Sequence, residues 1–188
     1  PLLSGLINIC GKEADPYTYL EYIRCVREEY STAPHFVLRN GEPYMVGALA
    51  RLNNNYLALG SLARDLCSQY NIKFPNYSIF ANNQAQALEI LHLIERAEDI
   101  LEELAGRNLN PSPIYTKGRN IGIAITEAPR GILIHKYRVN DDGVVLSADI
   151  ITPTAQNLKS IEKRAEELTR VLLDKQYDLS LIHISEPT

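Results

Sequence analysis

The segment Ile121–Tyr137, IGIAITEAPRGILIHKY, decides the fold because the periodicity of the chain changes here. Two short apolar runs of strand character flank the motif EAPRG at Glu127–Gly131. Pro129 lacks a backbone N–H and fixes its own φ, which suits the end of a strand. Arg130 then has two alternatives. It points into solvent, as an arginine in a turn commonly does, or it is held as a fixed positive fork against a group that needs one.

The strand pattern continues downstream of this motif. A third β-branched run, VVLSADIIT, follows the hairpin signal NDDG at 140–143. We therefore expect an antiparallel β region over residues 120–152. The segment after it has helical periodicity and predicts an amphipathic helix over 156–174.

The residues upstream predict mainly helix, over 13–106. Asp15 is a candidate N-cap with Pro16 at the first helical position. Apolar residues over 46–70 recur as in one or two helices, with an interruption near Asn53–Asn55. The chain is thus predicted to be α+β, mainly α with a small antiparallel β insert.

The segment 82–104, NNQAQALEILHLIERAEDILEEL, is the clearest helix. Asn82 or Asn83 is expected to cap its start, and Gly106 to end it. Its acidic residues lie opposite the apolar stripe and predict a solvated face, not a metal site. The apolar stripe consists of Ala87, Leu88, Leu91, Ile94, Ala97, Leu101 and Leu104.

Composition excludes several classes of function. The 188 residues carry a net charge of −4 and are 45% hydrophobic, which is ordinary for a globular chain and too acidic for a nucleic-acid surface. No apolar run approaches the roughly 20 residues of a membrane span. Cys10, Cys25 and Cys67 form no Cys-x-x-Cys pair, and free cysteines suit a reducing cytoplasm.

Two proline-containing motifs lie at strand ends, EAPRG and TPTAQN. The hairpin between them can bring their backbones together. Arg130 would supply up to five donors and Thr154 a hydroxyl, a combination that suits a small anionic group. On these residues alone, a surface position for Arg130 remains open.

Three motifs carry a family resemblance. EPYMVGALARLN (Glu42–Asn53), EAPRGILIHKY (Glu127–Tyr137) and ITPTAQN (Ile151–Asn157) occur in this order. Together they resemble the large subunit of nickel–iron hydrogenases, from about Tyr17 to Leu173. The His-x-Tyr after the arginine motif is similar to the soluble, cytoplasmic multi-subunit group. The resemblance implies part of that large-subunit fold.

The resemblance also implies site residues. Arg130 would lie over a nickel–iron centre with cyanide and carbon monoxide ligands and assist heterolytic splitting of H2, with electrostatic stabilisation the safer role. Pro129 would line the pocket around a cyanide. Thr154, placed by the turn at Pro153, would donate to a cyanide nitrogen. The backbone carbonyl of Ile150 would bind a magnesium or iron ion. The implied partners are an iron–sulfur small subunit and further electron-transfer subunits, with H2 as substrate.

The chain departs from this family at the metal ligands. The family binds its metals through two Cys-x-x-Cys pairs, and neither pair is present. Residues 179–188, LSLIHISEPT, resemble translated adapter or vector sequence. We therefore expect 1–178 to be a partial large-subunit domain and the last ten residues a non-native tail. We expect no nickel or other cofactor bound to this fragment, and no activity from it.

The alternative is a non-catalytic helical interaction subunit of a redox complex that keeps the scaffold without the metal. The histidines do not decide between the two. His135 alternates within an apolar strand and is expected to be a buried, hydrogen-bonded core residue. His35, His92 and His183 show no pattern.

Overall fold

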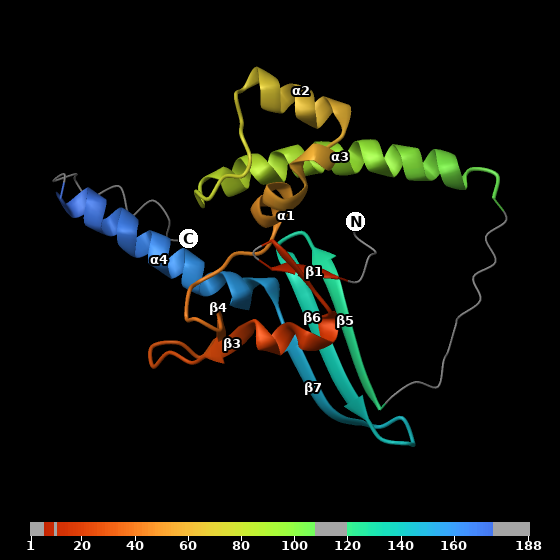
Figure 1. The fold of residues 1–188 in the computed structure, drawn as a ribbon, viewed down its shortest axis with the longest axis vertical. Helices are drawn as coiled ribbons and strands as arrows, with labels where there is room; N and C mark the ends of the chain where they lie inside the picture. The colour runs from red at the N-terminus through yellow and green to blue at the C-terminus, as the bar shows by residue number, and fades with distance from the viewer. Residues whose placement is uncertain (1–5, 10, 108–119, 175–188) are drawn as a thin grey trace, which may run out of the picture.

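The computed structural model describes residues 6–9, 11–107 and 120–174. Within these ranges, three helices gather at one end of the molecule, and a three-stranded sheet, a fourth helix and two short hairpins make up the other part (Figure 1). Helices and small antiparallel sheets together confirm the α+β class. The predicted tail at 179–188 and Cys10 lie outside the described residues.

The sheet of the EAPRG segment has the order β5–β6–β7 and is antiparallel throughout. Its strands are β5 (Ile121–Ala128), β6 (Gly131–Val139) and β7 (Val145–Ile151). Pro129 and Arg130 form the two-residue link between β5 and β6, with Ala128 paired to Gly131. The predicted β region is confirmed, and Gly143 adopts φ +82 in the second turn.

The N-terminal part differs from the predicted helix over 13–106. It contains two β hairpins, β1 (Ile7–Ile9) with β2 (Lys12–Ala14) and β3 (Ile23–Val26) with β4 (His35–Leu38). A short 3₁₀ helix, η1 (Pro16–Glu21), connects them. Its predicted cap is confirmed, because the Asp15 carboxylate accepts the Tyr17 N–H at 2.7 Å. The 3₁₀ helix ends at Glu21, and the chain enters β3 two residues later, at Ile23.

The helical region from residue 48 onward follows the sequence pattern. α1 (Ala48–Asn55) and α2 (Ser61–Gln69) are separated by the 3₁₀ turn η2 (Tyr56–Ala58), at the predicted interruption. α3 spans Ala81–Leu104, and Gly106 follows it with φ +80. None of the described helices has the length and apolar content that a membrane crossing requires.

The prediction that Asn82 or Asn83 caps the start of α3 is wrong. Phe80 occupies the N-cap position of α3 and makes no side-chain cap. The Asn82 side chain instead accepts the Leu49 N–H at 3.3 Å, at the start of α1. Gly47, the N-cap of α1, has no side chain to satisfy this helix terminus. A residue of α3 therefore caps a different helix, which sequence position alone does not reveal.

Two hydrophobic clusters form the core. We call the first the helical cluster and the second the sheet cluster. The final helix, α4 (Pro153–Asp174), packs against β4 and β6 and contributes to the second. The helical cluster contains Ala48, Leu49, Leu52, Leu59, Ala63, Ala81, Ala85 and Leu88. The sheet cluster contains Ile7, Tyr19, Ile23, Phe36, Ile134, Ile151 and Ala155.

Candidate functional site

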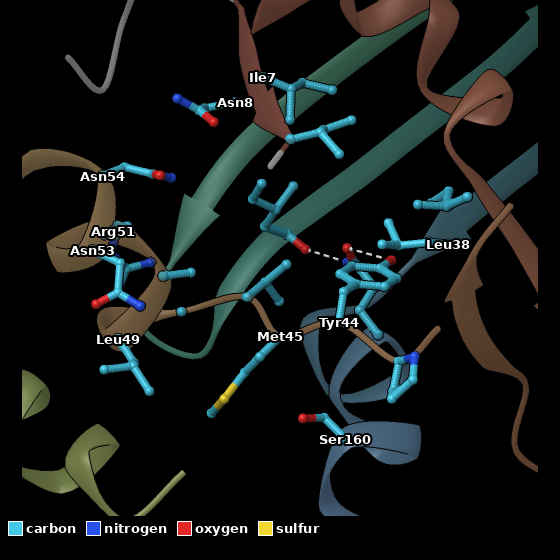
Figure 2. A pocket seen from close by; sticks show the side chains of 18 of the residues that line it. Ile7, Asn8, Leu38, Tyr44, Met45, Leu49, Arg51, Asn53, Asn54 and Ser160 are labelled. Atoms are coloured by element: carbon cyan, nitrogen blue, oxygen red, sulfur yellow. Dashed lines mark hydrogen bonds between the residues drawn. The ribbon is translucent and has the colours of Figure 1, made fainter. Parts of the chain in front are cut away.

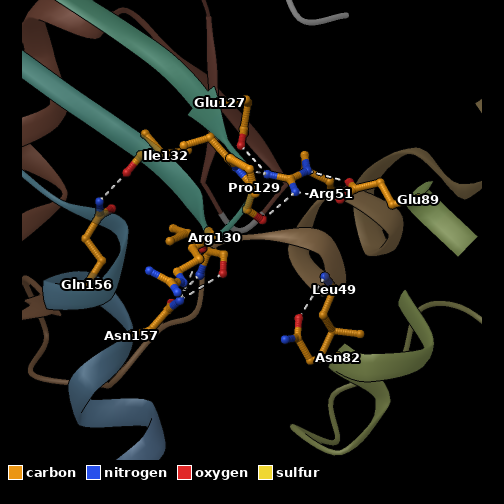
Figure 3. A network of polar contacts seen from close by, with 12 residues as sticks. Leu49, Arg51, Asn82, Glu89, Glu127, Pro129, Arg130, Ile132, Gln156 and Asn157 are labelled. Carbon is orange, nitrogen blue, oxygen red and sulfur yellow. Dashed lines mark hydrogen bonds and ion pairs between the residues drawn. The ribbon is translucent and has the colours of Figure 1, made fainter. Parts of the chain in front are cut away.

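The three sequence motifs converge at one place in the structure. Tyr44–Arg51 leads into α1, Glu127–Ile132 forms the β5–β6 turn, and Thr152–Asn157 begins α4 (Figure 3). We call these three segments the motif junction. They lie far apart in the chain, yet side chains of the first and third segments bind backbone atoms of another segment.

Two glycines allow the backbones to meet at the motif junction. Gly131 has φ +130, and a Cβ on it would lie 2.8 Å from the Gly47 nitrogen. Gly47 has φ +114, and a Cβ on it would lie 2.8 Å from the carbonyl oxygen of Arg130. Both positions therefore require glycine twice over, for the backbone conformation and for the space. This answers why glycine follows Arg130 in the motif.

Two consecutive side-chain amides of α4, Gln156 and Asn157, form hydrogen bonds to the other two segments of the motif junction. Asn157 accepts the Val46 N–H at 2.8 Å and donates to the Val46 carbonyl at 3.2 Å. Gln156 is buried and donates to the Ile132 carbonyl at 2.6 Å, while Tyr44 donates to Gln156 at 3.2 Å. Side-chain amides replace backbone partners here because the three segments share no ladder of strand pairing.

Arg51 of α1 makes the densest contacts of the motif junction. Its guanidinium binds the Glu89 carboxylate of α3 through two bonds, at 2.5 and 2.6 Å. It also binds Glu127 at 2.5 Å and the carbonyls of Ala128 and Pro129 at 3.1 and 3.2 Å. Burial alone lowers the pKa of Arg51, but hydrogen bonds and attraction from Glu89 and Glu127 raise it overall, so Arg51 stays charged.

A cavity of about 1070 Å³ borders the motif junction. Tyr44, Met45 and Leu49 line it near α1, and Ile7 and Leu38 line it on the side of the sheet cluster (Figure 2). Burial raises the pKa of Tyr44, so its hydroxyl stays protonated and donates to Gln156. The wall thus combines apolar side chains with polar and charged ones such as Arg51, Gln156 and Lys163.

Similar proteins share much of this chain. The Sulfhydrogenase 1 subunit alpha of Pyrococcus furiosus is 40% identical over 169 residues, which cover 89% of this chain and 38% of that protein. The Sulfhydrogenase 2 subunit alpha of the same organism is 34% identical over 134 residues, covering 71% of this chain and 32% of that protein. The chain therefore spans about a third to two fifths of these curated relatives. No family model matches the sequence.

A solved structure shares the fold. An NAD⁺-reducing [NiFe]-hydrogenase in the H2-reduced state superposes with a TM-score of 0.60 at 25% identity. The match covers 76% of this chain and 33% of that one. The chain is a relative of hydrogenase subunits. The motif junction is thus part of a hydrogenase-like fold, as the sequence resemblance predicted.

Four of the predicted site residues lie in two of the segments of the motif junction. Pro129 and Arg130 are exposed in the β5–β6 link (Figure 3), while Pro153 is buried and Thr154 exposed in the first turn of α4. Asn157, three residues after Thr154, approaches the Arg130 carbonyl at 3.5 Å. Residues three apart share a helix face, so Thr154 belongs to the α4 face that meets the arginine turn.

Ile150 lies further along the sheet than the other predicted site residues. It is on β7, which is an edge strand, and is paired in register with His135. Its side chain is exposed. The structure thus separates the predicted carbonyl ligand from the arginine turn by the length of β6 between Gly131 and His135.

The described residues do not supply a metal-binding set. Among residues 6–9, 11–107 and 120–174, no three His, Cys, Asp or Glu side chains gather as a cation would require. Cys25 is exposed on β3, and Cys67 is half-buried on α2 with a pKa that burial raises. A raised pKa disfavours the thiolate that nickel and iron bind, so Cys67 does not fit a nickel–iron centre.

Sequence reasoning missed two residues with strong contacts, His35 and Arg51. His35, which showed no pattern, is fully buried, with Nδ1 3.1 Å from the Ala33 carbonyl and Nε2 2.9 Å from Glu162. His135 was expected to be buried and is only half-buried, with Nδ1 3.0 Å from the Tyr137 hydroxyl. Arg51 was also missed, although a lone arginine within the apolar pattern of GALARL was an available signal.

Proposed function

We propose that this chain is part of the catalytic large subunit of a nickel–iron hydrogenase of the soluble, cytoplasmic multi-subunit group. The parent enzyme would oxidise H2 reversibly and pass electrons to an iron–sulfur small subunit and further electron-transfer subunits. One observation carries the proposal. Three motifs of hydrogenase type, distant in sequence, meet around the Arg130 turn in a chain related to hydrogenase subunits.

Arg130 is the proposed catalytic residue of this chain. A guanidinium keeps its charge at physiological pH and offers donors in a rigid fork. Among the described residues, no carboxylate lies within ion-pair distance of Arg130, although several other arginines are so paired. An exposed, unneutralised fork on a backbone fixed by glycine contacts is suited to stabilising charge that develops in a reaction.

Pro129, Pro153 and Thr154 are the proposed companions of Arg130. The proline ring of Pro129 presents an apolar wall beside the arginine, and the Thr154 hydroxyl presents a donor from the first turn of α4. Pro153 fixes the start of that helix. These residues would surround a cofactor with cyanide and carbon monoxide ligands, and the Ile150 carbonyl would serve a separate magnesium or iron ion.

The metal ligands of the parent enzyme would be two Cys-x-x-Cys pairs, which the 188 residues of this chain do not contain. Soft thiolates are the ligands that hold nickel and iron in such a centre. We therefore assign this chain one wall of the site, with the arginine and the threonine, and derive no reaction step through the metals.

The test is Arg130→Lys in the complete parent enzyme. Lysine keeps the charge on a flexible stem and loses the planar fork. Losing two charge-assisted interactions of roughly 1.5–3 kcal/mol each corresponds to a fall of about 10²–10⁴ in the rate of H2 uptake. Nickel content should be unchanged. Thr154→Ala should be milder, because it removes a single donor.

The outcomes separate this proposal from the alternative. A fully metallated Arg130→Lys enzyme with a near-normal rate returns Arg130 to the role of a surface residue. A complete parent that binds no nickel, and whose full reading frame lacks both cysteine pairs, is instead the non-catalytic scaffold subunit.

A further inference from the structure

Every donor of Arg51 is engaged in the structure. A guanidinium has five N–H groups, one on Nε and two on each terminal nitrogen. Nε donates to Glu89, Nη1 to Glu127 and the Ala128 carbonyl, and Nη2 to Glu89 and the Pro129 carbonyl (Figure 3). Five donors therefore meet five acceptor contacts, and rotation of the guanidinium would break several of them at once.

The acceptors of Arg51 lie in two different parts of the fold, on α3 and at the end of β5. Glu89 belongs to α3, one residue after the buried Leu88 of the helical cluster. The other acceptors, Glu127 and the carbonyls of Ala128 and Pro129, are the last three residues before Arg130. Arg51 therefore ties the end of β5 to the helical cluster at the point where the chain enters the arginine turn.

The charges at Arg51 make this tie strong. One guanidinium lies between two carboxylates, and all three side chains are largely shielded from solvent, with 19%, 13% and 26% exposed for Arg51, Glu89 and Glu127. Charge-assisted, bidentate bonds in such a setting are shorter and stronger than bonds between neutral groups. Lysine at this position would offer three donors from a single nitrogen and could not span the same acceptors.

We propose that Arg51 is a positioning residue for Arg130. It holds the carbonyls of Ala128 and Pro129, and with them the direction in which the Arg130 side chain leaves the turn. This inference rests on the proposed function, since it takes Arg130 as the group that acts on substrate. The guanidinium of Arg51 donates its hydrogen bonds to Glu89, to Glu127 and to backbone carbonyls, among the residues that the structure describes.

A double-mutant cycle in the complete parent enzyme tests the inference. Arg51→Lys should lower the rate of H2 uptake by about 10- to 100-fold at unchanged nickel content, because a displacement near 1 Å costs on the order of 100-fold. Combined with Arg130→Lys, it should cost less than about 3-fold more than Arg130→Lys alone, since the fork that it positions is gone. A merely structural role predicts that the two factors multiply.

Hydrogen exchange gives a readout independent of activity. In Arg51→Lys, the peptide covering 128–133 should exchange faster, while a peptide within α4 covering 158–168 should not change. Arg96→Lys is the matched control, since Arg96 is exposed on α3 and pairs with Asp99 within its own helix. It should alter neither the rate nor the exchange.

Glu127→Gln covers the case in which Arg51→Lys does not fold. It keeps the shape of the side chain and removes one charged partner, so a fall of about 3- to 10-fold is expected, again without multiplying with Arg130→Lys. The inference is overturned if these variants exchange and turn over as the wild type does, or if their effects multiply with Arg130→Lys. If Arg130→Lys itself retains its rate of H2 uptake, the proposed catalytic role of Arg130 fails and this inference fails with it, whereas the hydrogenase activity of the parent enzyme stands.

Discussion

The motif junction and the second half of α3 carry equally strong sequence signals and have opposite structures. At the motif junction, short motifs from three segments are held by glycine contacts, side-chain amides and Arg51. In α3, a regular apolar stripe continues to Leu104, but burial ends with Leu88. Figure 1 shows the later turns of α3 extending beyond α1 and α2. Ile90, Leu93, Ile94, Ile100, Leu101 and Leu104 are exposed.

This difference shows what each kind of signal reports. Periodicity reports which face of a helix is apolar, and it is silent about whether anything covers that face. A glycine with positive φ, or a charged residue within an apolar segment, indicates that another part of the chain lies close to it. The glycine leaves room for that backbone, and the charge needs a partner there. The predictions below test the contrast by substitution in both regions.

The largest effect is expected from Gly131→Ala. The new methyl group would meet Val46 and the Gly47 backbone, in a conformation that alanine avoids. Strain of roughly 1–2 kcal/mol and overpacking of about 1–3 kcal/mol should add, which lowers the free energy of unfolding by about 2–5 kcal/mol. Urea unfolding measures it. Gly143→Ala is the control, since Gly143 also has positive φ but nothing within 4 Å, and should show the strain alone.

The next comparison lies within α3. Leu88→Ala should lower the free energy of unfolding by about 2–5 kcal/mol, because Leu88 is only 3% exposed in the helical cluster. Leu101→Ala should change it by less than about 0.5 kcal/mol, because Leu101 is 69% exposed. Equal effects from the two substitutions, measured on this chain alone, would mean that the later turns of α3 are covered.

Asn157→Ala tests the amide link of the motif junction. It leaves the N–H and the carbonyl of Val46 without their partner, at a cost of about 1–3 kcal/mol in the free energy of unfolding. Asn157→Asp keeps the acceptor for the Val46 N–H and loses only the donor, so its cost should be smaller. If both variants unfold with the wild-type midpoint, the contact is dispensable.

The smallest effect concerns pH and lies away from both regions. Desolvation raises the pKa of Glu162, but hydrogen bonds from Lys159, Tyr30 and His35 outweigh it and lower the pKa overall. A carboxylate with a lowered pKa adds stability above its unfolded pKa, and this stability is lost as the pH falls through the folded pKa. Glu162→Gln should therefore flatten the fall in stability below about pH 4.5, by under about 1 kcal/mol. An unchanged acid profile would remove Glu162 as its source.

The sequence was sufficient for elements whose signal is local. The strands around EAPRG, the break near Asn53–Asn55 and the end of α3 at Gly106 all depend on periodicity or on turn residues. The hairpins β1–β2 and β3–β4 were not predicted, because strands of three or four residues gain their stability from tertiary partners. In the same way, the cap from Asn82 to α1 is invisible until the two helices meet.

The residues of the candidate site show the same distinction between local sequence signals and contacts made only in the folded protein. Arg130 and Thr154 were proposed because short motifs resemble those of a known family. Arg51 and His35 were not, because their importance lies in contacts across the fold, with Glu89 and Glu127 in one case and Glu162 in the other. A buried charge is defined by its neighbours, and those are set by packing.

Between Tyr44 and Met45 the chain passes from the sheet cluster to the helical cluster. Tyr44 packs against the sheet cluster and Met45, the next residue, against the helical cluster. The Arg130 turn docks directly beside this step, through Val46 and Gly47. The conformation of the turn is therefore coupled to the segment that joins the two clusters, and a shift of either cluster at this point reaches Arg130 through Val46 and Gly47.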